Sequence, residues 1–156
     1  MPDANVFDAH YEYDETDPEG YRAGVVRISQ LAGGKDNVVK AFQIPPGQSI
    51  CPYHYEYEEE WLLVLEGKVA LRVPAGERTL QRGDLLCFPS GPDGAHKVTN
   101  RTDQMALTMM WSSAREPSVA VYPDSDKIGV WPGTDGDHVI LRRADGAVDY
   151  YDGERA

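Results

Sequence analysis

The chain has 156 residues, the size of one domain, and its 15 basic and 26 acidic residues give a formal net charge of −11. Binding to nucleic acid or to an anionic membrane surface needs a surface rich in Lys and Arg, so we expect neither partner. Apolar residues make up 41% of the chain, and runs such as residues 61–65 are too short to span a bilayer.

Two features favour a cytoplasmic protein. The N-terminal residues have neither the basic nor the apolar region of a secretory signal. Cys51 and Cys87 are too few for a disulfide scaffold, although a single bridge between them stays open.

The chain begins with an acidic stretch. Residues 1–21 contain seven acidic residues and no Lys or Arg, which predicts an irregular arm. Two alternatives are open: a solvated tail, or an arm held on the domain by Phe7, Tyr11 and Tyr13.

From residue 22 onward the pattern is typical of strands. Turn signals recur every 8–12 residues, which indicates an all-β sandwich or barrel. Glu66, Gly67 and Lys68 predict a tight hairpin, and a last hairpin is predicted between residues 138–142 and 147–151. We expect an N-terminal arm (1–21), a β-barrel core (22–111) and a C-terminal extension packed on the barrel (112–156). The predicted core strands are residues 22–29, 37–44, 60–65, 69–73, 78–81, 85–88, 98–100 and 105–111.

Four polar residues have the spacing of a metal site. His54 and Glu56 are two apart, so in a strand they share a face, and Glu60 has the same parity as Leu62. A carboxylate facing an apolar interior is costly unless it is paired with or bound to a cation. With His96 on a neighbouring strand, two imidazoles and one or two carboxylates suit Zn, Mn, Fe, Ni, Co or Cu better than Ca or Mg. Three or four protein ligands leave positions open for water or substrate.

At two motifs the sequence resembles the cupin superfamily. The first motif comprises Gly47, His54, Glu60 and Gly67. The second comprises Gly83, Pro89, Gly91, His96 and Asn100. The resemblance implies a jelly-roll barrel (a double-stranded β-helix) with a metal inside, and a homodimer. It implies no single activity, because cupins include dioxygenases, decarboxylases, sugar-phosphate isomerases, cyclases and binding domains without catalysis.

Glu56 is the main departure from the family pattern, because it stands where the motif has a second histidine. The loops before His54 and His96 are also longer than usual, by one and two residues. Our predicted ligands of a divalent transition metal are His54, Glu56, Glu60 and His96. Glu56 has two alternatives, a general base beside the metal or a solvent-facing side chain.

The predicted function is a metal-binding cupin that binds a small organic molecule in its barrel, as a dioxygenase-like or isomerase/lyase-like enzyme. The alternatives are a non-catalytic module that senses or stores a ligand or metal, and a structural cupin with an empty site. Cys51 and Cys87 are expected to be buried apolar residues, with a functional thiol at Cys51 as an alternative. His10 and His138 are not expected to be ligands. Weaker expectations place Trp111 and Arg72 in the pocket, and Tyr53, Tyr55 and Tyr57 on the opposite face, in a dimer interface.

Overall fold

Antiparallel strands dominate the computed structural model, which describes residues 4–133 and 136–155. The two α-helices, α1 (Ile28–Ala32) and α2 (Arg143–Gly146), are 5 and 4 residues long. Within the described ranges, none of the helices has the length and apolar character needed to cross a membrane. The all-β class predicted from the turn spacing is therefore confirmed.

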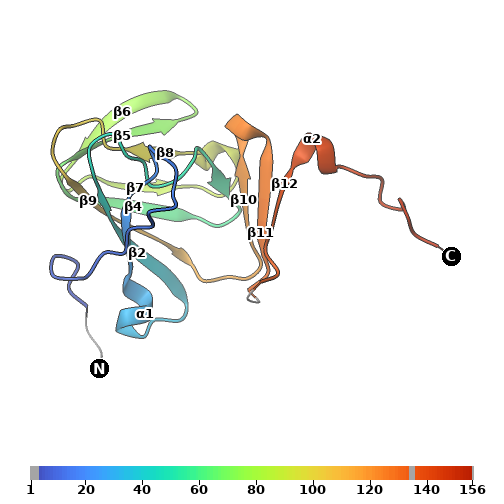
Figure 1. Ribbon diagram of the computed structural model, residues 1–156, viewed down its shortest axis with the longest axis horizontal. Coiled ribbons are helices and arrows are strands. Elements are labelled where there is room, and N and C mark those ends of the chain that lie inside the picture. The colour runs from blue at the N-terminus through green and yellow to red at the C-terminus, as the bar shows by residue number, and fades with distance from the viewer. Residues whose placement is uncertain (1–3, 134–135, 156) are drawn as a thin grey trace.

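Two sheets face each other and form the jelly-roll barrel (Figure 1). The larger sheet has the order β1-β2-β9-β4-β7 and the smaller has the order β6-β5-β8. The strands of the larger sheet are β1 (Gly24–Arg27), β2 (Asn37–Ile44), β9 (Ala106–Ser113), β4 (Glu60–Glu66) and β7 (Leu85–Phe88). Those of the smaller sheet are β6 (Gly76–Gln81), β5 (Lys68–Val73) and β8 (Lys97–Thr99).

A third sheet, of order β12-β11-β10-β3, joins the first metal motif to the C-terminal part of the chain. Its strands are β3 (Tyr55–Glu56), β10 (Ser118–Tyr122), β11 (Lys127–Trp131) and β12 (Val139–Arg142). One-turn 3-10 helices follow β7 and β10, at η1 (Pro92–Gly94) and η2 (Pro123–Ser125). In Figure 1 this sheet stands beside the barrel, and the chain after α2 runs away from it.

The main core lies between the two barrel sheets because alternate residues of each strand share a face. Leu62 on β4 and Leu71 on β5 are fully buried there, and Met110 on β9 is 8% exposed. The opposite face of the larger sheet carries a second cluster, which consists of Tyr11, Val26, Ala41 and Leu107. Each side of this sheet is therefore covered, one by the smaller sheet and the other by the N-terminal segment.

The acidic N-terminal arm packs on the barrel and is not a solvated tail. Tyr11 is only 6% exposed, and its hydroxyl donates to the carbonyl of Val6 at 2.7 Å. The backbones of Glu12 and Val25 exchange two hydrogen bonds of 2.9 Å, so the arm extends the edge of the sheet at β1. Burial of one aromatic ring and these two bonds hold the arm in place despite its charge.

Three local predictions are wrong. The predicted strand over residues 22–29 ends at Arg27, and the chain turns into α1 before the left-handed Gly33. The turn at Gly67 is a corner between sheets and not a hairpin, because β4 pairs with β7 and β9 whereas β5 pairs with β6 and β8. The predicted last hairpin is replaced by pairing of β12 with β11, and residues 147–155 form turns and irregular chain.

Candidate metal centre

The backbone brings the two motifs together. Residues 47–54 run antiparallel to residues 96–100, with Ile50 N donating to Val98 O at 3.1 Å. At the end of this ladder, His54 N donates to His96 O at 3.1 Å and His96 N donates to His54 O at 2.8 Å. This pairing sets the two histidines directly opposite each other, with ring centroids 4.8 Å apart.

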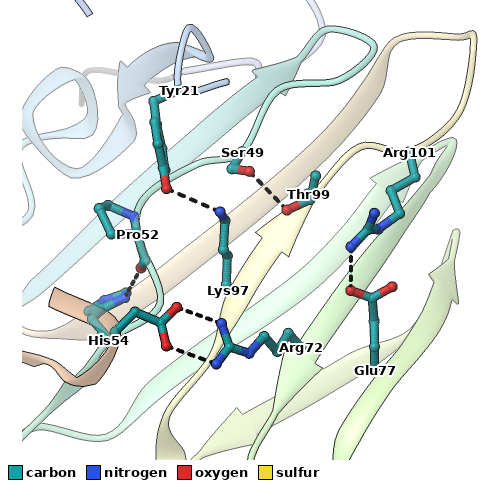
Figure 2. A network of polar contacts seen from close by, with 10 residues as sticks. Tyr21, Ser49, Pro52, His54, Arg72, Glu77, Lys97, Thr99 and Arg101 are labelled. Carbon is teal, nitrogen blue, oxygen red and sulfur yellow. Dashed lines mark hydrogen bonds and ion pairs between the residues drawn. The ribbon is translucent and has the colours of Figure 1, made fainter. Parts of the chain in front are cut away.

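Both imidazoles are oriented by backbone carbonyls. His54 Nδ1 lies 3.0 Å from Pro52 O, a contact drawn in Figure 2, and His96 Nδ1 lies 2.9 Å from Gly94 O. A carbonyl can only accept, so each Nδ1 carries the hydrogen and each Nε2 presents a lone pair. A metal-binding histidine is commonly oriented in this way.

Nε2 of His96 is buried and has no hydrogen-bond partner in the described part of the chain. Leaving a buried acceptor unpaired costs about 1–3 kcal/mol. The ring itself is fully buried and stacks on Phe88 with a centroid distance of 3.8 Å. His96 is therefore held rigidly with its lone pair directed toward His54 and Glu60.

Glu60 completes a compact group of possible ligands. Its Oε2 lies 3.7 Å from Nε2 of both His54 and His96, and the three ligand atoms lie within 4.8 Å of one another. These separations are longer than hydrogen bonds. Two ligands about 2.1 Å from a tetrahedral metal ion would be about 3.4 Å apart, so the two separations of 3.7 Å fit a transition metal with little movement.

Burial sets the protonation of this group. Burial lowers the pKa of His54. Burial and the nearby charge of His54 together lower the pKa of His96 to about 3. Both imidazoles are thus neutral near pH 7, as ligands must be. Burial and the nearby Glu56 raise the pKa of Glu60 to about 8, and a bound cation would reverse that shift by favouring the ionised carboxylate.

Glu56 lies at the edge of this group. Its Oε1 is 4.0 Å from Nε2 of His54, and its side chain is 21% exposed to a cavity, against 14% for Glu60. Burial also raises the pKa of Glu56. The structure thus gathers all four predicted residues around one point but draws only three of them into the compact group.

His54, Glu56 and Glu60 adjoin a cavity of about 550 Å³ that opens between β2, β9 and the third sheet, whereas His96 is buried behind them. Tyr122, on β10, packs nearly parallel to His54 with a centroid distance of 5.8 Å. Most other lining side chains are apolar or aromatic, with Lys40 and Arg115 as the cations. The cavity is large enough for a small organic molecule, and His54, Glu56 and Glu60 lie in its wall.

The structure separates the weaker predictions. Trp111 lines the cavity, whereas Arg72 is not among the residues that line it. The Arg72 guanidinium donates two hydrogen bonds, of 2.6 and 2.9 Å, to the carboxylate of Asp124. The expected burial of Cys87 is wrong, because this residue is exposed. Cys51 lines the cavity, with Sγ 3.5 Å from Nδ1 of His54, and burial raises the pKa of its thiol to about 12.

The two other histidines, His10 and His138, are exposed. The three tyrosines differ: Tyr53 is buried under the Arg72 guanidinium at 3.9 Å, and Tyr57 is 56% exposed and packs edge-on against Tyr55.

Sequence reasoning missed two parts of the cavity. Tyr122 and Trp131 come from the third sheet, whose pairing with β3 no local pattern shows. Lys40 did carry a signal, because it alternates with Val38 and Phe42 and so had to share their inward face.

Comparisons with known proteins agree with this fold. Residues 41–113 match the family described as the cupin domain. A protein described as a sugar phosphate isomerase, from Acidithiobacillus ferrooxidans, superposes with a TM-score of 0.80 at 22% identity, over 92% of each chain. A sugar phosphate isomerase from Silicibacter pomeroyi gives 0.80 and 22%, over 97% of this chain and 98% of that one.

A more distant match is the polyketide cyclase RemF from Streptomyces resistomycificus, with a TM-score of 0.63, 20% identity and coverage of 76% and 83%. Comparison with curated proteins finds no significant match. At these identities the solved structures establish the fold alone.

Proposed function

The chain belongs to the cupin superfamily, and we propose that it is a metal-dependent enzyme that binds a small organic molecule and moves a proton on it, as an isomerase does. The observation that carries the proposal is the convergence of two pre-oriented Nε2 atoms on Glu60, with that of His96 buried and unpartnered among the described residues. These residues would otherwise bear a desolvation cost with no compensating interaction.

His54, Glu60 and His96 are the proposed protein ligands. Three ligands leave coordination positions open toward the cavity, the arrangement of a catalytic rather than a structural metal site. When bound, a divalent transition metal would supply Lewis-acid polarisation of a substrate oxygen. The neutral state of both imidazoles and their fixed Nδ1–H orientation support this assignment.

Glu56 is the proposed proton carrier. It faces the same cavity, lies outside the compact group, and has a pKa that burial raises toward the range useful for general acid–base catalysis. On a hydroxy-carbonyl compound, its carboxylate would take the proton from the carbon that bears the hydroxyl and return it to the neighbouring carbonyl carbon. The hydroxyl proton would pass to the carbonyl oxygen, so that the carbonyl and hydroxyl groups exchange places with no net gain or loss of atoms. The similarity to two proteins described as sugar phosphate isomerases supports this class of reaction.

Solvent exchange tests the proposal. The metal-loaded protein is incubated in D₂O with a panel of small hydroxy-aldehydes and hydroxy-ketones, and deuterium incorporation at carbon is followed by NMR. We expect incorporation by the wild type, loss of at least tenfold in Glu56→Gln with metal content unchanged, and no loss in the exposed control Glu59→Gln. Loss of metal together with exchange in Glu56→Gln would instead make Glu56 a ligand.

Other outcomes identify the alternatives. Ligand binding without exchange would favour a non-catalytic binding module, and oxygen consumption with the same panel would favour a dioxygenase. Failure to bind any transition metal stoichiometrically would overturn the proposal.

A homodimer stays a prediction. Val139, Ile140 and Leu141 on β12 are 46%, 51% and 50% exposed, and β12 is the edge strand of its sheet. Such an exposed apolar edge favours pairing with another chain. Sedimentation equilibrium of the wild type and of Ile140→Lys would test this surface.

A further inference from the structure

Lys40 is a cation on the inward face of a barrel strand. On β2 it lies between Val38 and Phe42 in the alternating row that lines the cavity, and Met110 of β9 is its cross-strand partner. The other inward positions of this row, Val38 and Phe42, are apolar, so Lys40 is the one charged residue of this row, and Arg115 and Glu116 line another part of the cavity. An ammonium group is costly to bury without an anion.

The protein does not supply that anion by direct contact. Within residues 4–133 and 136–155, the Lys40 ammonium has no ion pair within 4.0 Å and no hydrogen bond. Its charge nevertheless reaches the cavity, because it acts to lower the pKa of Glu56 and Glu60 against the effect of burial. Lys40 thus faces the same space as the candidate metal centre without pairing with it.

The sheet register fixes the distance between the two features. Val38 pairs with Ser112, which pairs in turn with Glu60, so β2 and β4 flank β9 and the Lys40 position is diagonal to the Glu60 position. Neighbouring strands are about 4.8 Å apart and two residues extend about 6.8 Å along a strand, which sets the backbones of Lys40 and Glu60 about 12 Å apart across the sheet. A short molecule can span that gap between an ammonium group and the centre.

We propose that Lys40 binds the anionic group, carboxylate or phosphate, of the substrate, while another substrate oxygen reaches the centre formed by His54, Glu60 and His96. This inference rests on the proposed function and narrows its substrate to small anionic molecules. The walls beside Lys40, formed by Val38, Phe42 and Met110, accommodate the apolar body of such a molecule. Lys40 is therefore a specificity-determining residue and not a proton carrier.

Calorimetric titration of the zinc-loaded protein with matched pairs of probes tests this. The carboxylate pair is mandelate and its neutral counterpart 1-phenyl-1,2-ethanediol, and the phosphate pair is glycerol 3-phosphate and glycerol. We expect the wild type to bind the charged member of at least one pair about tenfold or more tightly than the neutral member. The pair that shows the preference identifies the anion.

The variants locate the preference. Lys40→Met should abolish it, Lys40→Arg should keep it, and Lys68→Met, an exposed lysine on β5, should leave it unchanged. An equal preference in Lys40→Met, or none in the wild type for either pair, would overturn the inference.

Zinc content separates this failure from failure of the proposed function. Lys40→Met should bind zinc as the wild type does. A wild type that binds zinc but shows no anion preference would refute only the role of Lys40, whereas a wild type without zinc would refute the metal centre.

Discussion

Replacing Glu60 with Gln removes one negative charge and changes little else. The side chain keeps its length and volume, so packing against the barrel wall is preserved. The lost group is the carboxylate whose Oε2 lies 3.7 Å from both imidazole Nε2 atoms. The variant therefore separates the electrostatics of the centre from its shape.

The metal-free protein should tolerate this change. Burial and Glu56 raise the pKa of Glu60 from 4.5 to about 8. That shift corresponds to roughly 4–5 kcal/mol of preference for the uncharged carboxyl group. Between about pH 4.5 and 8 the folded wild type bears a growing part of this penalty, and above pH 8 it bears nearly all of it. Glu60→Gln does not titrate, so without metal the variant should be equally or more stable than the wild type.

The metal-loaded protein should behave in the opposite way. A ligand at 100 times its Kd stabilises the fold by about 2.7 kcal/mol, which is about 5–10 °C in Tm for a chain of this size. We expect this increase in the wild type with Zn²⁺ or Mn²⁺, and its loss in Glu60→Gln. Thermal unfolding with and without metal measures both effects.

Glu66→Gln is the matched control, because Glu66 is exposed at the end of the same strand. Its metal-dependent shift in Tm should equal that of the wild type. The reasoning would be refuted if Glu60→Gln kept the full shift, or if its metal-free form were several kcal/mol less stable than the wild type at pH 8.5.

Three further predictions concern stability. In the metal-free protein the free energy of unfolding should fall from pH 6.5 to 8, because the folded state holds a proton on Glu60 that the unfolded state releases. Below pH 6.5 the lowered pKa of His96 acts in the opposite direction, because there the unfolded state binds a proton that the folded state does not. Urea titrations at several pH values measure how the free energy of unfolding depends on pH. A free energy of unfolding that does not change with pH would contradict this prediction. Asn100→Ala should cost about 3 kcal/mol, because the fully buried Asn100 amide donates to two backbone carbonyls at 2.7 Å, that of Ile44 among them; a cost below 1 kcal/mol by the same titration would show that these bonds are replaceable. Tyr11→Ala should increase amide hydrogen exchange in residues 4–12 with little effect on the barrel, and unchanged exchange would contradict the docking role of Tyr11.

The barrel could be predicted because its strands carry local signals. Asn37–Ile44 and Leu85–Phe88 are apolar-rich segments between turn residues, and both form with the predicted bounds. His54 and His96 were predicted to converge because two motifs with known spacing mark them. The cross-strand hydrogen bonds between their backbones then give the geometry that spacing alone could not.

The remaining features depend on contacts between distant segments. The chain at Gly67 turns from one sheet to another just after a bulge that follows Val64. The close approach of Met105 O, which would lie 2.9 Å from a Cβ at position 67, favours glycine there. The local sequence Glu66-Gly67-Lys68 is equally compatible with a hairpin, so it could not predict the change of sheet. Likewise, Tyr122 enters the cavity only because β10 pairs with β3, a partnership of two residues with no periodicity to detect.

X-ray absorption at the zinc edge tests the central claim most directly. The zinc-loaded wild type should contain one ion per chain, bound by two imidazole nitrogens at about 2.0–2.1 Å together with oxygen ligands. His96→Asn should lose one imidazole and most of the affinity. A zinc ion without imidazole ligands, or the same spectrum in the wild type and His96→Asn, would contradict a metal centre formed by His54, Glu60 and His96.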